Sequence, residues 1–286
     1  MATRTLGTTR TLPYLPALAF VLVWSSGYIA GPYGVTVMKP LALVGWRMVL
    51  AAVIVLVVAR VLRGPLRVDR AAAVRIAVVG FVMNGVQFGA MYLAFAAGLG
   101  ATLGALLHSL SPVLTAVVAG LVAGERLSRV QVLGFVLGVA GVLVVLGPDV
   151  EAAGGGIGLG FGLVGVLALS LGTLGQRWIG HGPDPLWSAA IQFAVSGPPL
   201  LLLALLVEGG DPVLDWPRAI GVLVRRGGAS AGSAVFFLSP PVTALLAWLV
   251  LGETLSAREA VGLVVAVVGV AAATAGASGV PEEPAT

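Results

Sequence analysis

Residues 110–128 read LSPVLTAVVAGLVAGERLS, and residues 238–256 repeat them as LSPPVTALLAWLVLGETLS. The match runs without a gap from residues 107–142 to residues 235–270, and 17 of the 36 aligned positions are identical. Identity at this level in a single register indicates an internal duplication. Each copy is a long apolar run, a Gly-Glu turn and a second apolar run. The repeated unit is therefore predicted to be a pair of membrane-spanning helices.

The composition indicates an all-α, polytopic membrane protein. Hydrophobic residues make up 58% of the 286 residues, charged residues only 10%, and the mean hydropathy is +1.06. A soluble domain of this size is far less apolar. The sequence pI of about 10.1 does not indicate a nucleic-acid partner, because most basic residues lie in loops between apolar runs. With no Cys and two distant His, we expect no thiol chemistry, metal site or other cofactor.

Nine apolar runs approach the length that crosses a hydrocarbon core of about 30 Å. The ninth is somewhat short. The runs cover residues 14–32, 41–59, 74–95, 101–123, 130–146, 157–176, 186–207, 231–251 and 260–273.

The basic residues predict the orientation of these spans. With a cytoplasmic N-terminus, the loops on the inner side carry almost all the Arg residues of the first seven spans, and the outer loops carry acidic residues and a single Lys. We expect a multi-pass protein of a bacterial inner (plasma) membrane. The inner basic residues are Arg4, Arg10, Arg60, Arg63, Arg67, Arg70, Arg75, Arg126, Arg129 and Arg177.

The two halves differ in length. From position 59 to Ser111 the chain advances 52 residues, whereas from position 207 to the matching Ser239 it advances 32, so about one helix is missing. Only the short segment 215–226 stands in its place. If this segment is a re-entrant half-helix, the halves remain inverted; if nine spans cross fully, the duplicated pairs run parallel. The predicted units are a first repeat at 12–148, a second at 155–276, and a disordered tail at 277–286.

Several motifs resemble the EamA-type branch of the drug/metabolite transporter superfamily. They are GAT at 100–102 followed by the duplicated segment, GFVLGVAGV at 134–142, VWSSGYIAGPYG at 23–34 and PLALVGWR at 40–47. The resemblance implies two EamA-like halves, normally five helices each in an inverted repeat. It also implies transport of small metabolites, either amino-acid-like or drug-like solutes, and we expect an exporter that works by alternating access. The shortened second half keeps an alternative open, a non-transporting paralogue or partner subunit.

Polar residues at membrane depth are the candidates for a central solute cavity. Arg47 either faces this cavity and binds an anionic or zwitterionic solute, or extends its side chain to the interface. Asn84 and Gln87 lie three residues apart, and we expect them on one helical face, lining the cavity or bonding neighbouring helices. The full set of candidates is Trp24, Ser25, Tyr28, Arg47, Asn84, Gln87, Tyr92, His108, Ser111, Gln192, Phe236 and Ser239.

Two further features concern coupling and motion. His108 could titrate near neutral pH and couple transport to protons, although its repeat counterpart is Phe236. Pro112 and Pro240 occupy matching positions in the two copies and are candidate hinges or simple structural kinks.

No catalytic constellation was found, so we expect a protein that is not an enzyme. Ser128 and Ser256 are predicted to cap the helices that follow them, and Gly134 with Gly138 to allow close helix packing. The expected partners are the lipid bilayer and a small solute, with the proton as a candidate coupling ion; the oligomeric state is not predicted.

Overall fold

The computed structural model describes residues 14–123, 128–147, 150–151, 154–180, 182–209, 239–252 and 256–275, without the side chains of 14–20, 23, 122–123, 239–241 and 270–275. All regular elements formed by these residues are helices. They are α1 (Tyr14–Val35), α2 (Pro40–Arg63), α3 (Arg70–Gly80), the π-helix η1 (Phe81–Val86), α4 (Gln87–Ala96), α5 (Ala101–Ser109), α6 (Ser111–Ala123), α7 (Arg129–Leu146), α8 (Gly155–Ile179), α9 (Pro185–Val207), α11 (Ser239–Leu251) and α12 (Ala257–Ala275).

The helices fall on the predicted apolar runs, which confirms the all-α membrane fold class. The run at 231–251 is described only from Ser239 onward. By length and composition, six of the described helical stretches could each cross a membrane. They are Pro40–Arg63, Arg70–Ala96, Ala101–Leu121, Arg129–Leu146, Gly155–Ile179 and Pro185–Val207.

Two of these stretches are interrupted in ways that the sequence explains in part. Arg70–Ala96 contains the π-helical turn η1, and Ala101–Leu121, which covers the fourth predicted span, breaks at Leu110 between α5 and α6. Pro112 has no N–H for the carbonyl one turn earlier, so the ladder of hydrogen bonds is interrupted where the break occurs. Pro240 likewise lies in the first turn of α11, and whether either position works as a hinge stays a prediction.

The helix starts in the two copies share one capping arrangement. The Ser128 hydroxyl accepts from the Gln131 backbone N–H at 3.2 Å, and the Gln131 amide accepts from the Ser128 N–H at 2.8 Å. Ser256 and Glu259 repeat both bonds at the start of α12, at 3.2 and 2.7 Å. The predicted caps are confirmed, and each fixes the residue at which the second helix of the pair begins.

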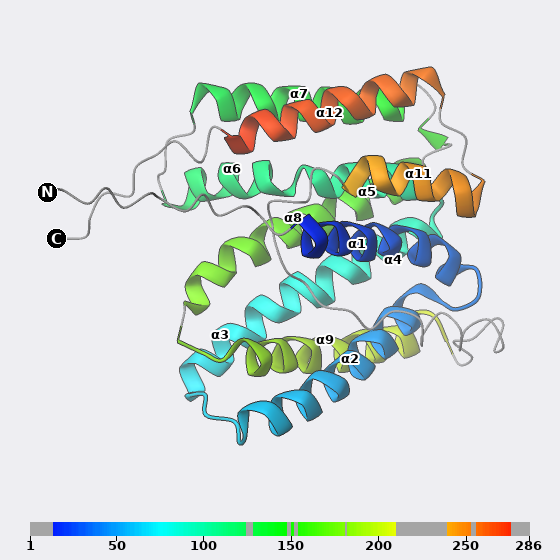
Figure 1. The fold of residues 1–286 in the computed structure, drawn as a ribbon. Coiled ribbons are helices and arrows are strands. Elements are labelled where there is room, and N and C mark those ends of the chain that lie inside the picture. Colours follow the sequence, from blue (N-terminus) through cyan, green and yellow to red (C-terminus); the bar gives the residue numbers. More distant parts are fainter. Residues whose placement is uncertain are drawn as a thin grey trace, which may run out of the picture.

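Helices α7 and α12 pack side by side at one edge of the bundle and run in opposite directions (Figure 1). A Cβ on Gly141 would meet the Ala266 backbone N at 2.5 Å, and a Cβ on Gly269 would meet the Gly138 N at 2.6 Å. Residue numbers along the contact therefore fall in α12 as they rise in α7, so the two helices are antiparallel. Only glycine permits this approach at Gly141 and Gly269, and the backbones of Gly134 and Gly138 lie against Gly269 in this contact.

Helices α2 and α9 form the corresponding antiparallel pair at the opposite edge of the bundle (Figure 1). The Lys39 ammonium donates to the Glu208 carbonyl at 2.6 Å at one end of the pair. Arg63 Nε lies 3.2 Å from the Asp184 carboxylate at the other end. These contacts fix the direction of both helices.

The duplicated hairpins are therefore inverted relative to each other, because α12, the copy of α7, runs antiparallel to it. The prediction of parallel pairs, one of the two alternatives left by the length difference, is wrong for the described residues. The segment 215–226, on which that alternative depended, lies outside them, as does the predicted tail at 277–286.

Candidate functional site

The predicted site residues on α1, α2, α4 and α5 lie at a similar depth in the bundle. Tyr28 is seven residues from the end of α1, Arg47 seven from the start of α2, and His108 seven from the start of α5. At 1.5 Å per residue each lies about 10 Å from the same end of the bundle. Tyr92, four residues from the end of α4, lies about 6 Å from it. The four side chains form a polar layer between the interface and the midplane.

Arg47 is held between two side chains of α4. Its Nη1 donates to the Tyr92 hydroxyl at 2.9 Å, and its Cζ lies 4.9 Å from the centre of the Phe88 ring. The arginine is half-buried, and among the described residues no carboxylate lies within ion-pair distance of its guanidinium. The side chain therefore points toward α4 within the bundle, where the described residues offer its positive charge a hydroxyl and an aromatic face.

His108 is buried against α1 and α4. Its Nε2 lies 2.8 Å from Nε2 of the Gln87 amide, and its Nδ1 lies 3.3 Å from the Gly104 carbonyl. The Gln87 amide nitrogen can only donate, so His108 Nε2 is the acceptor of this bond. His108 Nδ1 therefore carries the ring proton and donates to the Gly104 carbonyl. This arrangement fits a neutral imidazole. A second proton on Nε2 would require the Gln87 amide to turn over and present its oxygen.

Tyr28 completes this part of the layer. Its ring centre lies 5.5 Å from that of His108, with the planes tilted by 58°. Both residues are almost fully buried. Because Gln87, Phe88 and Tyr92 all belong to α4, this one helix connects the Arg47 contact to the His108 contact.

Ser111 lies just after the break in the fourth span. Its hydroxyl is 3.2 Å from that of Ser170 on α8, and the Ser170 hydroxyl is also 3.2 Å from the Ser111 carbonyl. Thr115 donates to the same carbonyl at 2.7 Å. The bonds between Ser111 and Ser170 join the start of α6 to α8.

Asn84 lies near the middle of its span, and Gln192 lies seven residues from the start of α9, at the opposite end of the bundle from the polar layer. The Asn84 amide donates to the Gln192 side-chain oxygen at 3.3 Å, and Gln176 on α8 donates to the same oxygen at 3.4 Å. Asn84 and Gln87 therefore contact different helices, contrary to the expectation of a shared face. Asn84 lies inside the π-helical turn, which holds more residues per turn than an α-helix and changes the angle between the two side chains.

The remaining candidates are Trp24, Ser25, Phe236 and Ser239, together with the candidate hinge Pro240. Trp24 is half-buried and Ser25 is fully buried on α1. Phe236 lies outside the described residues, and the side chains of Ser239 and Pro240 are not described.

The sequence reasoning missed Ser170, Phe88 and Gln176, which contact the candidate residues directly. Ser170 is the single Ser in its span, and Gln176 the single amide there. A search of every apolar run for polar residues would have found both. Phe88 has no such signal, because an aromatic residue in a membrane helix is ordinary.

The fold and the polar layer define a multi-pass helical membrane protein with internally duplicated, inverted hairpins. The chain belongs to the EamA-like transporter family, whose model matches residues 11–147 and 221–275.

Two further similarities were found. A WAT1-related chloroplastic protein of Arabidopsis thaliana is 28% identical over 176 residues. The aligned part is 51% of this chain and spans only 42% of the length of that relative. The chain is also similar in fold to a protein of known crystal structure, with a TM-score of 0.64. The superposition covers 91% of this chain and 96% of the chain in that crystal structure. Its 20% sequence identity supports likeness of fold alone.

Proposed function

We propose that this protein transports a small solute that carries a carboxylate, and that Arg47 binds that carboxylate. The observation that carries the proposal is the environment of Arg47. Burying a cation in a membrane bundle costs free energy unless an opposite charge accompanies it. Among the described residues the guanidinium is bonded only to the Tyr92 hydroxyl and stacked on Phe88. A solute carboxylate would supply the missing charge through a bidentate pair.

The neighbouring side chains would orient the rest of the solute. The Phe88 ring offers an apolar face beside the guanidinium, and the Tyr92 hydroxyl can turn to the solute when Arg47 releases it. An amino-acid-like or drug-like solute with one acidic group fits this combination. In this structure Arg47 pairs with Tyr92, and Gln87 pairs with His108.

Transport would proceed by alternating access between the inverted halves. Inverted hairpins allow two related conformations that open to opposite sides of the membrane. The antiparallel packing of α7 with α12 supports this mechanism over the alternative of a non-transporting paralogue. We propose export from the cytoplasm across a bacterial inner membrane, with the N-terminus inside. The proton is the proposed coupling ion, since protonation of His108 would reorganise its bond to Gln87 beside the site.

The test is solute flux in proteoliposomes containing wild type, Arg47→Gln, Arg47→Lys or Arg60→Gln. The substrate panel should pair amino acids and monocarboxylates with their amides. Arg60 is the matched control, because it lies on the same helix, is exposed and lies near the opposite end of α2. We expect carboxylates to be moved and amides not. Arg47→Gln should lose roughly tenfold or more of the flux at equal protein amount, the equivalent of one charge-assisted hydrogen bond.

Arg47→Lys should retain part of the flux, because it keeps the charge but not the planar fork. Arg60→Gln should stay within about twofold of wild type, since an exposed charge is largely screened. If Arg47→Gln transports carboxylates as well as wild type, Arg47 serves only the structure and the site lies elsewhere.

A further inference from the structure

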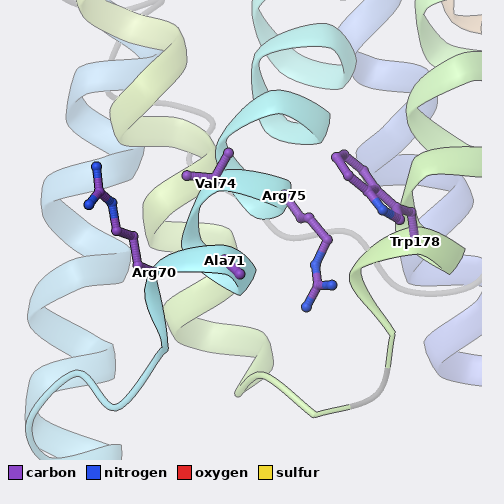
Figure 2. Close-up of a pocket in the computed structure, with 5 residues that line it drawn as sticks. All are labelled: Arg70, Ala71, Val74, Arg75 and Trp178. Atoms are coloured by element: carbon purple, nitrogen blue, oxygen red, sulfur yellow. The ribbon is translucent and has the colours of Figure 1, made fainter.

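A shallow cavity of about 550 Å³, open to its surroundings, lies between the first turns of α3 and the last turn of α8, away from the polar layer. It is lined by Arg70, Ala71, Val74, Arg75 and Trp178 (Figure 2). This is the end of the bundle at which Arg63 pairs with Asp184, and it carries most of the arginine residues of the described loops.

Arg75 has a buried guanidinium nitrogen beside this cavity. It extends from α3 toward Trp178 at the end of α8, whereas the guanidinium of Arg70 points to the other side of α3 (Figure 2). The Arg75 Nε is buried and makes no hydrogen bond to the described residues. A buried, unpaired guanidinium N–H is costly and calls for an acceptor. Asp69 attracts Arg75 electrostatically, but among the described residues no ion pair joins the two side chains.

The cavity continues into apolar surface that faces the bilayer. On α3, Val74 and Val78 are about half exposed, and Phe81 follows one turn later on the same face. On α8, Leu171 lies two turns before Trp178 on the same face and is also about half exposed. A ligand held at Arg75 would thus have apolar helix surface running from it toward the middle of the membrane.

We propose that this cavity binds an anionic phospholipid, with the lipid phosphate on Arg75, the glycerol region against Trp178 and an acyl chain along Val74 and Val78. Arginine forms paired, charge-assisted hydrogen bonds to phosphate oxygens, and Trp favours the level of the lipid headgroups. Basic cavities between membrane helices are a recurrent form of lipid recognition. The continuous apolar surface favours a lipid over a soluble anion, which has nothing to place there.

The experiment measures thermal unfolding of the detergent-purified full chain as dioleoyl phosphatidylglycerol is added. Dioleoyl phosphatidylcholine, with the same acyl chains, and inorganic phosphate serve as the two comparison ligands. The proteins are wild type, Arg75→Gln and the matched control Arg67→Gln. Arg67 is an exposed arginine at the same end of the bundle that does not line the cavity. Salt is kept at about 0.15 M, where the Debye length is about 8 Å.

We expect phosphatidylglycerol to raise the unfolding temperature of wild type, and phosphatidylcholine and phosphate to have much smaller effects. Arg75→Gln should require roughly fivefold or more phosphatidylglycerol for the same half-maximal shift. Arg67→Gln should stay within about twofold. An equal loss of phosphatidylglycerol affinity in Arg75→Gln and Arg67→Gln would overturn the proposed site, because it would indicate diffuse electrostatic attraction of the lipid to the basic end of the bundle. If inorganic phosphate raises the unfolding temperature as much as phosphatidylglycerol does, the cavity binds soluble anions and the lipid proposal is wrong. If phosphatidylcholine raises it as much, the protein does not recognise the anionic headgroup and the proposal is also wrong.

A second variant keeps the proposal testable if Arg75→Gln does not fold. Trp178→Leu leaves every charge in place and changes an exposed side chain. It should weaken the phosphatidylglycerol effect and leave the small phosphatidylcholine effect unchanged. An undiminished phosphatidylglycerol effect in this variant would contradict the proposed position of the lipid.

Discussion

Substituting Gly141 with Ala should destabilise the protein by forcing α7 away from α12. A Cβ at this position would lie 2.5, 2.6 and 2.7 Å from the N, Cβ and Cα of Ala266. Two of these atoms are backbone, so no side-chain rotation can make room. Reaching ordinary contact near 3.5 Å requires the helices to separate by almost 1 Å. Overpacking of this kind costs roughly 1–3 kcal/mol.

Gly160→Ala is the control for this prediction. Gly160 lies inside α8, and a Cβ there would have nothing within 4 Å. Both substitutions gain up to about 1 kcal/mol of helix propensity, so the difference between them isolates the steric cost. Unfolding of the two variants in detergent, by denaturant titration or by heat, should therefore differ by roughly 1–3 kcal/mol. If both variants are equally stable, Gly141 does not face Ala266, and the antiparallel packing described above is refuted.

Two further predictions concern helix ends. The Glu208 carboxylate accepts from the backbone N–H groups of Leu41 at 2.7 Å and Ala42 at 3.1 Å. Glu208→Ala should therefore lower the free energy of unfolding, measured by heat, by roughly 1–2 kcal/mol. It should also speed amide hydrogen exchange at Leu41 and Ala42. Unchanged exchange there would contradict the cap. The hydrogen bond from the Ala72 N–H lowers the pKa of Asp69. The ionised Asp69 side chain therefore stabilises the start of α3 at any pH above the ordinary Asp pKa. This stabilisation is lost as the pH falls through the lowered pKa of the folded state. The unfolding temperatures of wild type and Asp69→Ala should therefore differ at neutral pH and converge in acid below about pH 4, and a difference that persists in strong acid would contradict this reading.

The positions of the helices could be predicted from the sequence because each depends on local features. Apolar length defines the spans, and Ser128 with Gln131 or Ser256 with Glu259 fixes where the second helix of each pair starts. The relative direction of the two copies could not be predicted in this way. It depends on contacts between residues far apart in the chain, such as Gly141 with Ala266.

The candidate site could be predicted only as a set of residue types. Polar residues in apolar runs indicated Arg47, His108, Gln87 and Tyr92, but their pairing follows from how α2 and α5 pack on α4. The π-helical turn that separates Asn84 from Gln87 leaves no clear mark in the sequence, because its hydrogen bonds are set by packing against α8 and α9.

The most direct test of the central claim, that two inverted halves enclose the Arg47 site, is the membrane side of the two chain ends. Reporters that are active in only one compartment would be fused before Met1 and after Thr286. Helix α12 ends on the side of the bundle at which α1 begins (Figure 1). The account predicts that both reporters are active on the same side. Activity on opposite sides would mean parallel copies and would contradict alternating access between inverted halves.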